Sequence, residues 1–89
     1  LFPSAFRLSC YPNPFNATTT FSFTLPQAGD VKLRLFDLLG REVDEIYAGR
    51  MAAGARSIRY SSEHLSSGLY FARLETPSLS VTQKLVILK

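Results

Sequence analysis

The chain has 89 residues, of which 46% are hydrophobic and 19% are charged, so its composition is that of one small globular domain and not of a disordered segment. Its net charge is +3 at pH 7, and its lysines and arginines are scattered without forming a run, which argues against a nucleic-acid-binding surface. No stretch is apolar for long enough to span a bilayer. The single cysteine, Cys10, excludes an internal disulfide and a cysteine-rich zinc site, and we expect it to be a small buried hydrophobic residue rather than a reactive thiol.

The beginning of the chain predicts an arm that leads into the domain. Residues 1–6 read as a linker or a loosely attached arm, and the folded domain is expected to span residues 7–89. The chain starts Leu1-Phe2-Pro3, without a basic region or an initiating methionine, so we expect no signal peptide within it. We therefore expect the chain to be a piece of a larger protein, in which a targeting signal upstream would lie outside this sequence.

A proline-rich segment follows, with the sequence Tyr11-Pro12-Asn13-Pro14-Phe15-Asn16. Each proline fixes φ at about −65° and pushes the preceding residue towards extended geometry. The segment is therefore expected to be a stiff, extended lead-in that is anchored by the packing of Tyr11 and Phe15. The simpler interpretation of this segment is a structural turn, and the more specific one is a site that a processing enzyme recognises.

Apolar and polar residues alternate between turn signals along the rest of the chain, which predicts β-strands. The predicted strands cover residues 18–25, 31–36, 42–47, 55–60, 68–75 and 79–88. Their inward side chains are predicted to be Phe21, Phe23, Leu25, Val31, Leu33, Leu35, Ile58, Tyr60, Tyr70, Ala72 and Leu74. Residues 42–47 alternate least regularly and are expected to form a bulged or edge strand. Short strands at intervals of roughly ten residues are typical of an antiparallel β-sandwich, here of about seven strands.

The connection after residue 36 has the sequence of a tight turn. Gly40 is expected to supply a positive φ, and the carboxylate of Asp37 to cap the backbone of the turn. Arg41 or Arg73 is placed to pair with Asp37 or Glu75. Surface pairs of this kind contribute only about 0–1 kcal/mol, so we interpret them as setting the register of the strands.

Two later segments are predicted to be loops. Gly49 and Gly54 flank the first of them, which carries Met51 and two alanines. The second, residues 61–67, is polar and irregular and has room for a single helical turn. Gly68 then begins the next predicted strand.

Side chains that could carry catalysis are sparse, and we predict that the domain is not an enzyme. A catalytic dyad or triad needs a nucleophile, a base and an orienting group that lie together. Cys10 and His64 are the only obvious candidates, and nothing in the sequence orients either of them. A metal site would need clustered carboxylates or His/Cys spacing, and the pair Asp44-Glu45 leaves open only a calcium ion in a loop.

The final residues 84–89 form a strand that carries apolar side chains on both faces, because Lys84, Val86 and Leu88 alternate with Leu85 and Ile87. Such a strand is usually central and buried, so closure of the core is one interpretation. At a sheet edge it would instead leave unpaired N–H and C=O groups beside an apolar outer face. A partner could capture that edge by strand addition, and a second copy of the chain could use it to form a dimer.

Several motifs succeed one another in a familiar order. They are Tyr-Pro-Asn-Pro-Phe-Asn at 11–16, Leu-Pro-Gln-Ala-Gly at 25–29, Asp-Leu-Leu-Gly-Arg-Glu-Val at 37–43, Ala-Gly at 53–54, Ser-Gly-Leu-Tyr-Phe-Ala-Arg-Leu at 67–74 and Gln-Lys-Leu-Val-Ile-Leu-Lys at 83–89. Over nearly the whole chain this succession resembles the C-terminal sorting domains of bacterial type IX secretion cargo (the Por secretion, or type A, sorting domain) of the Bacteroidetes and their relatives. The core is also similar to the immunoglobulin-like domain of the flagellar hook-capping protein. The motif positions that carry the resemblance are Tyr11, Pro12, Asn13, Pro14, Phe15, Asp37, Gly40, Arg41, Gly54, Gly68, Tyr70 and Arg73.

The resemblance implies an immunoglobulin-like sandwich that lies last in a secreted multidomain protein and works without a cofactor. Such a domain directs its cargo from the periplasm across the outer membrane through the type IX translocon. A surface sortase then removes the domain and transfers the cargo to surface lipopolysaccharide. The resemblance places the export signal in the final strand, here at Lys84, Leu85, Val86, Ile87, Leu88 and Lys89.

Two positions depart from the family pattern, and one rival class remains. Ala17 stands where a proline is common, which loosens that turn, and Tyr60 stands where many members have tryptophan.

The rival is a carbohydrate-binding or spacer module of a secreted enzyme, because similar small sandwiches bind sugars. Sugar platforms usually need exposed aromatic rings, and the chain has no tryptophan and two tyrosines, Tyr60 and Tyr70, that are predicted to point inward. The activity of the parent protein, whether glycoside hydrolase, protease or adhesin, does not follow from these residues.

Overall fold

The structure is a computed structural model that describes residues 7–89, so the predicted arm at residues 1–6 lies outside the described residues. Within that range the chain forms seven β-strands and no helix. The strands are β1 (Leu8–Tyr11), β2 (Thr18–Leu25), β3 (Gly29–Phe36), β4 (Glu42–Met51), β5 (Gly54–Ser61), β6 (Gly68–Glu75) and β7 (Ser80–Ile87). The described part of the chain therefore has no helix that is long and apolar enough to cross a membrane.

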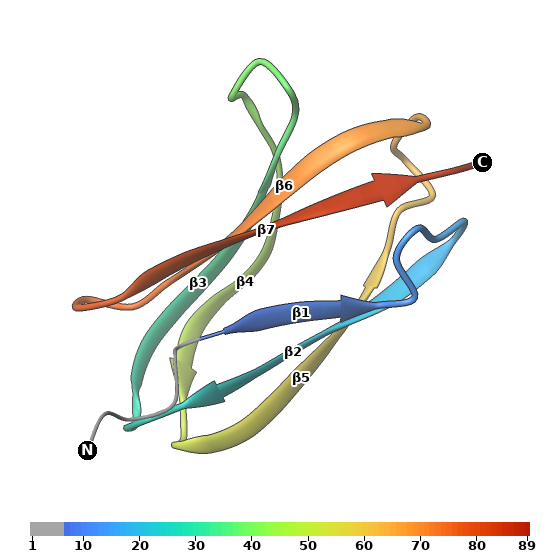
Figure 1. Cartoon of the computed structure of the whole chain (residues 1–89). Helices are drawn as coiled ribbons and strands as arrows, with labels where there is room; N and C mark the ends of the chain where they lie inside the picture. Colours follow the sequence, from blue (N-terminus) through green and yellow to red (C-terminus); the bar gives the residue numbers. More distant parts are fainter. Residues whose placement is uncertain (1–6) are drawn as a thin grey trace.

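The strands form two antiparallel sheets that pack face to face (Figure 1). One sheet has the order β1-β2-β5, and the other has the order β4-β3-β6-β7. Each strand pairs with its neighbours in an antiparallel register. The predicted antiparallel β-sandwich of about seven strands is thus confirmed.

The core between the sheets contains most of the side chains that the alternation predicted to point inward. Phe21, Leu33 and Leu74 are fully buried, and Tyr60 and Tyr70 are 6% and 7% exposed. Burying a side chain of this size contributes about 1.5–3 kcal/mol, so these positions hold the two sheets together. Ile58 is the exception among the predicted inward residues, because it lies only half-buried on β5, at the edge of its sheet.

Two elements differ from the sequence-based expectation by more than the one or two residues seen at the ends of β3, β5 and β7. β1 was not predicted as a strand, because it is only four residues long and its two inward residues, Leu8 and Cys10, are too few to show a period. β4 continues through Gly49 to Met51, where a loop was expected, because its ladder with β3 runs on to the pair Gly29 and Met51. The expected irregularity is confirmed, since the register of this ladder shifts twice and β4 lies at a sheet edge.

The turn between β3 and β4 is built as predicted. Gly40 has a φ of 80°, and the Asp37 carboxylate accepts hydrogen bonds from the backbone N–H of Leu39 at 2.9 Å and of Arg41 at 3.0 Å. The Arg41 guanidinium also contacts Asp37, at 2.9 Å. Farther along the sheet Arg73 lies 3.7 Å from the carboxylate of Glu75, so both expected ion pairs form.

Candidate functional site: the terminal strand and its clasp

The terminal strand β7 lies at the edge of the four-stranded sheet and also closes the core. It pairs with β6 along its whole length, from Gly68 opposite Ile87 to Glu75 opposite Ser80. Leu85 and Ile87 are fully buried, whereas Leu88 is 56% exposed. The two interpretations of this strand, core closure and an edge position, therefore both hold.

The outward edge of β7 is covered near its C-terminal end by the connection from β1 to β2, residues 12–17, which we term the clasp. The backbone N–H of Phe15 donates to the carbonyl of Val86 at 3.1 Å, and the N–H of Leu88 donates to the carbonyl of Phe15 at 2.9 Å. The Asn13 carboxamide donates to the Lys84 carbonyl at 3.1 Å and accepts from the Val86 N–H at 3.0 Å. The expectation that an edge position would leave these groups unpaired is therefore wrong for this stretch.

Phe15 anchors the clasp, and Tyr11 does not. The bridge between Phe15 and Ile87 is parallel, and the Phe15 ring enters the core with 4% exposure. Tyr11 is 82% exposed, so its predicted role as a packing anchor is wrong. The expected extended lead-in is also wrong, because the backbone bends at residues 12–14 on its way from one sheet to the edge of the other. The peptide bonds that precede Pro12 and Pro14 are cis.

Two buried hydroxyl groups donate hydrogen bonds to backbone carbonyls of the clasp. Thr19, on β2, donates to the carbonyl of Pro12 at 2.8 Å. Ser62, just after β5, donates through its hydroxyl to the carbonyl of Asn16 at 3.2 Å and through its N–H to the carbonyl of Ala17 at 2.8 Å. Thr19 is 2% exposed and Ser62 is fully buried, so both ends of the clasp are fixed from the interior.

Ser62 also contacts the other end of the chain. The ammonium of Lys89 donates to the Ser62 carbonyl at 2.7 Å, and the Lys89 N–H donates to the hydroxyl of Ser67 at 2.8 Å. The predicted irregular segment at 61–67 contains a turn closed by the bond from the Leu65 N–H to the Ser62 carbonyl, and it is not helical. Sequence reasoning missed Ser62 and Ser67, because a serine in a polar loop gives no local signal of its distant partners.

Most of the predicted motif residues fall into two regions of the molecule. Gly54 and Arg73 lie outside both, since Gly54 begins β5 opposite Leu25 and Arg73 lies on β6 opposite Arg34. The structure brings the clasp together with residues 84–89, and Gly68 and Tyr70 of β6 lie beside them, opposite Ile87 and Leu85. The turn residues Asp37, Gly40 and Arg41 belong instead to the β3–β4 hairpin, which projects from the sandwich (Figure 1).

The two candidates for catalysis, His64 and Cys10, are placed by different contacts. His64 Nε2 lies 2.9 Å from the Asp44 carboxylate, which also accepts a hydrogen bond from the Tyr60 hydroxyl at 2.7 Å. Burial, followed by the hydrogen bond to Asp44, raises the pKa of Tyr60. Cys10 lies on β1, and burial raises the pKa of its thiol, which disfavours the reactive thiolate. Asp44 is thus engaged in tying β4 to β5, and among residues 7–89 no three metal-ligating side chains gather.

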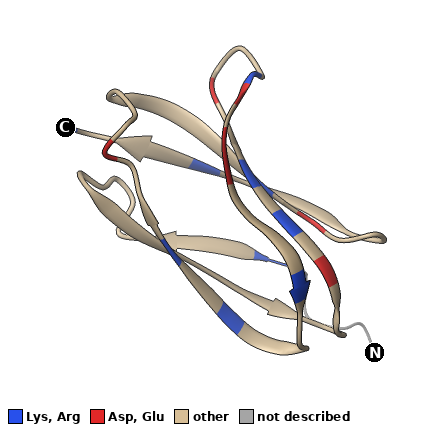
Figure 2. Cartoon of the chain, turned by 180° about the vertical axis from the view of Figure 1, so that it is seen from behind, with Lys and Arg blue, Asp and Glu red and all other residues tan. Residues whose placement is uncertain are grey.

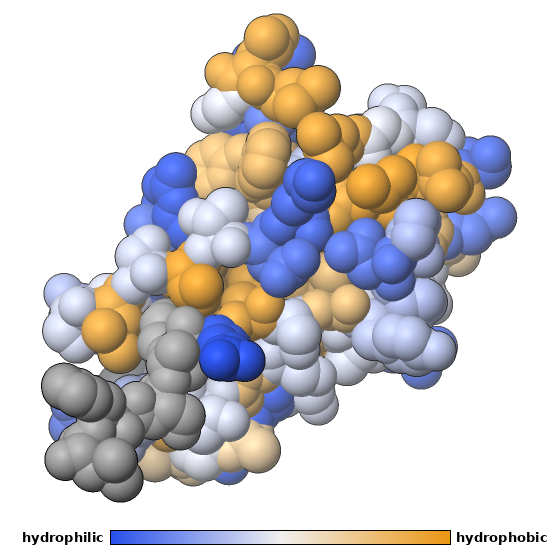
Figure 3. Space-filling view, in the orientation of Figure 1, coloured by the Kyte–Doolittle hydropathy of each residue, from blue (hydrophilic) through white to orange (hydrophobic). Residues whose placement is uncertain are grey.

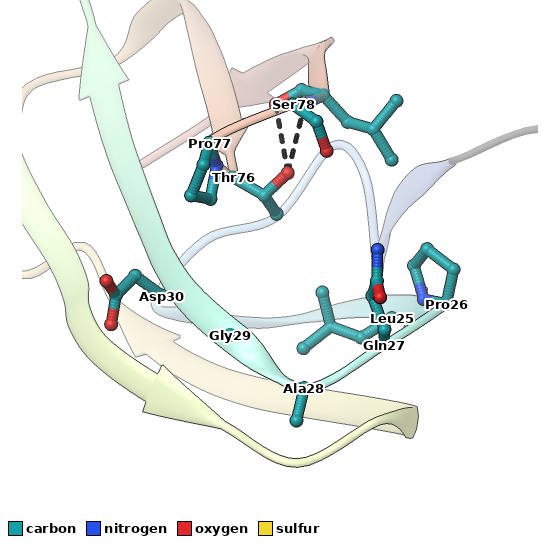
Figure 4. A pocket seen from close by; sticks show the side chains of 10 residues that line it. Leu25, Pro26, Gln27, Ala28, Gly29, Asp30, Thr76, Pro77 and Ser78 are labelled. Atoms are coloured by element: carbon teal, nitrogen blue, oxygen red, sulfur yellow. Dashed lines mark hydrogen bonds between the residues drawn. The ribbon is translucent and has the colours of Figure 1, made fainter.

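A small hollow of about 160 Å³ lies between two turns of the sandwich (Figure 4). The turns at residues 25–30 and 76–79 line it with aliphatic, proline and polar side chains and with the carboxylate of Asp30. The second turn is fixed by a bond from the Leu79 N–H to the Thr76 hydroxyl at 3.0 Å. This lining lacks the aromatic rings on which sugars stack, so the hollow gives the carbohydrate-binding alternative no support.

Basic and acidic residues are interspersed along the chain, as Figure 2 shows from behind. Arg34 pairs with Glu75 and with Glu42, and the guanidinium groups of Arg34 and Arg73 lie over the ring of Phe36 at 5.3 Å and 4.6 Å. Apolar side chains gather at the tip of the β3–β4 hairpin and near the C-terminal end of β7 (Figure 3).

The fold and this site define an immunoglobulin-like sandwich whose C-terminal strand is clasped at a sheet edge. A family described as the secretion system C-terminal sorting domain matches residues 9–88, and the chain belongs to this family of type IX secretion sorting domains. The match covers the clasp and the terminal strand together. A comparison with curated proteins gives no significant match. The domain is thus a sorting signal for type IX secretion, which implies interaction with that machinery and export to the cell surface or beyond.

Proposed function

We propose that the domain is a non-catalytic signal that the type IX outer-membrane translocon reads at residues 84–89 while the sandwich is folded. The observation that carries this proposal is the double attachment of β7, to β6 on one side and to the clasp on the other. Leu85 and Ile87 anchor the strand in the core and are out of reach of a partner. The outward positions Lys84, Leu88 and Lys89 are exposed and are the side chains that a partner can contact first.

Attachment to the cell surface forms the second part of the proposal. Family membership supports it, because a sorting domain that delivers cargo across the outer membrane meets the surface sortase when it emerges. The sortase then cuts the domain from its parent protein and joins the parent to surface lipopolysaccharide. The domain itself supplies recognition and no catalytic group, so the parent protein carries whatever activity is exported.

The experiment places a reporter with a cleavable periplasmic leader ahead of the chain, in a host with the type IX machinery and in the same host without its translocon. Fractionation and protease accessibility then measure how much reporter lies in the periplasm, on the surface and in the medium. We expect the reporter on the surface of the first strain and in the periplasm of the second. Equal distributions in the two strains would refute the sorting role. Release into the medium without surface retention would refute only the attachment.

A further inference from the structure

The two sides of β7 are attached to the molecule very unequally. On one side β6 pairs with it along its full length, and Leu85 and Ile87 bury their side chains in the core. On the other side the clasp contributes two hydrogen bonds through the backbone of Phe15, two through the single side chain of Asn13, and one buried side chain, the Phe15 ring. Segments held by fewer buried contacts open at lower free energy, so the clasp side opens more readily than the β6 side.

The clasp occupies the edge of β7 as a strand would. Phe15 donates to Val86 and accepts from Leu88, the residues on either side of Ile87, which is the pattern of a parallel ladder. The Asn13 carboxamide takes the place of the next peptide group, since it both donates and accepts. The Phe15 ring fills a core position between the sheets. An extended polypeptide with a large apolar side chain can satisfy the same groups.

We propose that the clasp is a displaceable cover, and that the partner which reads the signal contributes an extended strand that runs parallel to β7 in place of residues 13–15. This inference rests on the proposed reading of residues 84–89. Only the middle of the clasp needs to move, because Thr19 and Ser62 hold its two ends. In the free domain the cover keeps the edge from pairing with other chains, as exposed strand edges tend to do. The partner captures the edge by strand addition.

A peptide with the sequence of residues 11–17 serves as the probe for an open edge. It is titrated into the wild-type chain, into the variant Asn13→Ala/Phe15→Ala, and into the control variant Tyr11→Ala/Asn16→Ala, which keeps the groups that contact β7. Chemical shifts of the Val86 and Leu88 amides report binding. The peptide binds only while the edge is open, so its apparent affinity is proportional to the fraction of time that the edge is open. We therefore expect the first variant to bind at least about tenfold more tightly than the wild type and the control.

A folded Asn13→Ala/Phe15→Ala variant that binds no better than the control would overturn the proposal. Protection of the amides in the β6–β7 ladder from hydrogen exchange shows whether that variant is folded. If the double variant is not folded, the single variant Asn13→Ala replaces it, and binding no better than the control would again overturn the proposal. A peptide with alanine in place of its phenylalanine should lose binding, since the proposal requires the apolar side chain.

The rate of export separates this proposal from the sorting role itself. With the reporter fusion, Asn13→Ala should be exported faster than the wild type, because the edge is open for a larger fraction of the time. An equal or slower rate in a folded variant would contradict displacement and would make the clasp part of the recognised surface. Loss of the sorting role would appear differently, as an export that does not respond to changes at Lys84 and Leu88.

Discussion

The carboxamide of Asn13 accepts the N–H of Val86 at 3.0 Å although 73 positions separate the two residues in the sequence. The same carboxamide donates to the carbonyl of Lys84, so one side chain satisfies two outward groups of an edge strand. This contact joins the proline-rich motif at one end of the chain to the terminal strand at the other. The two most distinctive parts of the sequence thus form one site.

Removal of the Asn13 side chain should weaken this end of the sandwich. We expect Asn13→Ala to lower the free energy of unfolding by about 1–2 kcal/mol, because two hydrogen bonds of about 0.5–1.5 kcal/mol each are lost. Asn16→Ala is the matched control, since Asn16 contributes its backbone carbonyl to the clasp contacts, and it should change stability by less than about 0.5 kcal/mol. Urea denaturation measures both. Equal effects of the two substitutions would contradict the role given to the carboxamide.

The two aromatic residues of the proline-rich segment, Tyr11 and Phe15, should differ sharply in their contribution to stability. Phe15 is 4% exposed and Tyr11 is 82% exposed, so Phe15→Ala leaves a cavity and Tyr11→Ala does not. We expect a loss of about 3–5 kcal/mol for Phe15→Ala, a large share of the stability of a domain of this size. Tyr11→Ala should stay within about 0.5 kcal/mol of the wild type. Thermal unfolding of both variants decides the point, and comparable losses would show that Phe15 does not anchor the clasp.

The β3–β4 turn should lose its contribution to stability in acid. The backbone N–H of Arg41, together with that of Leu39 and the Arg41 side chain, lowers the pKa of Asp37 below its ordinary value of 3.8. A lowered pKa in the folded state means that the carboxylate stabilises the fold above pH 3.8 and ceases to do so as the pH falls through the lower, folded-state value. Asp37→Asn should therefore be less stable than the wild type at neutral pH, and the difference should vanish in strong acid. Leu38→Ala should keep the wild-type pH dependence, and a difference for Asp37→Asn that does not vary with pH would refute the assignment.

The hydroxyl of Tyr60 should make the domain sensitive to alkali. Burial, together with the acceptor Asp44, raises the pKa of Tyr60 above its ordinary value of 10.0. A raised pKa in the folded state means that the stabilisation is complete below pH 10.0 and is lost progressively as the pH rises above that value. Above pH 10 the wild type should therefore lose stability faster than Tyr60→Phe. Tyr47→Phe is the control, because the Tyr47 hydroxyl donates to a backbone carbonyl, and it should follow the wild type. Parallel curves for the wild type and Tyr60→Phe would contradict the account.

Local patterns in the sequence were sufficient to predict most of the sandwich. The two-residue alternation located β2 and β6 at their observed bounds, and the turn chemistry of Asp37 and Gly40 was correct in detail. These features depend on neighbouring residues alone. β1 was not predicted, because four residues carry too little alternation to be distinguished from a linker.

The site was only half predictable, because its contacts join distant parts of the chain. The alternation at residues 84–88 correctly indicated a terminal strand with apolar groups on both faces, and Phe15 was correctly predicted to pack. The pairing of Asn13 with Lys84 and Val86, and of Ser62 with both the clasp and Lys89, depends on how the two sheets are placed. No pattern within either segment specifies a partner so far away in the sequence.

Whether the exposed side of the terminal strand is the sorting signal is best tested with the core left intact. Deletion of residues 84–89 would remove Leu85 and Ile87, both fully buried, and would confuse a lost signal with a lost fold. The measurement is therefore the extracellular fraction of a reporter that carries Lys84→Glu/Leu88→Asp. The control is Lys32→Glu/Leu79→Asp, which makes the same charge changes at exposed positions away from the C-terminal end of β7. We predict that the first variant stays in the periplasm while the control is exported like the wild type; equal export of the two folded variants would contradict the account.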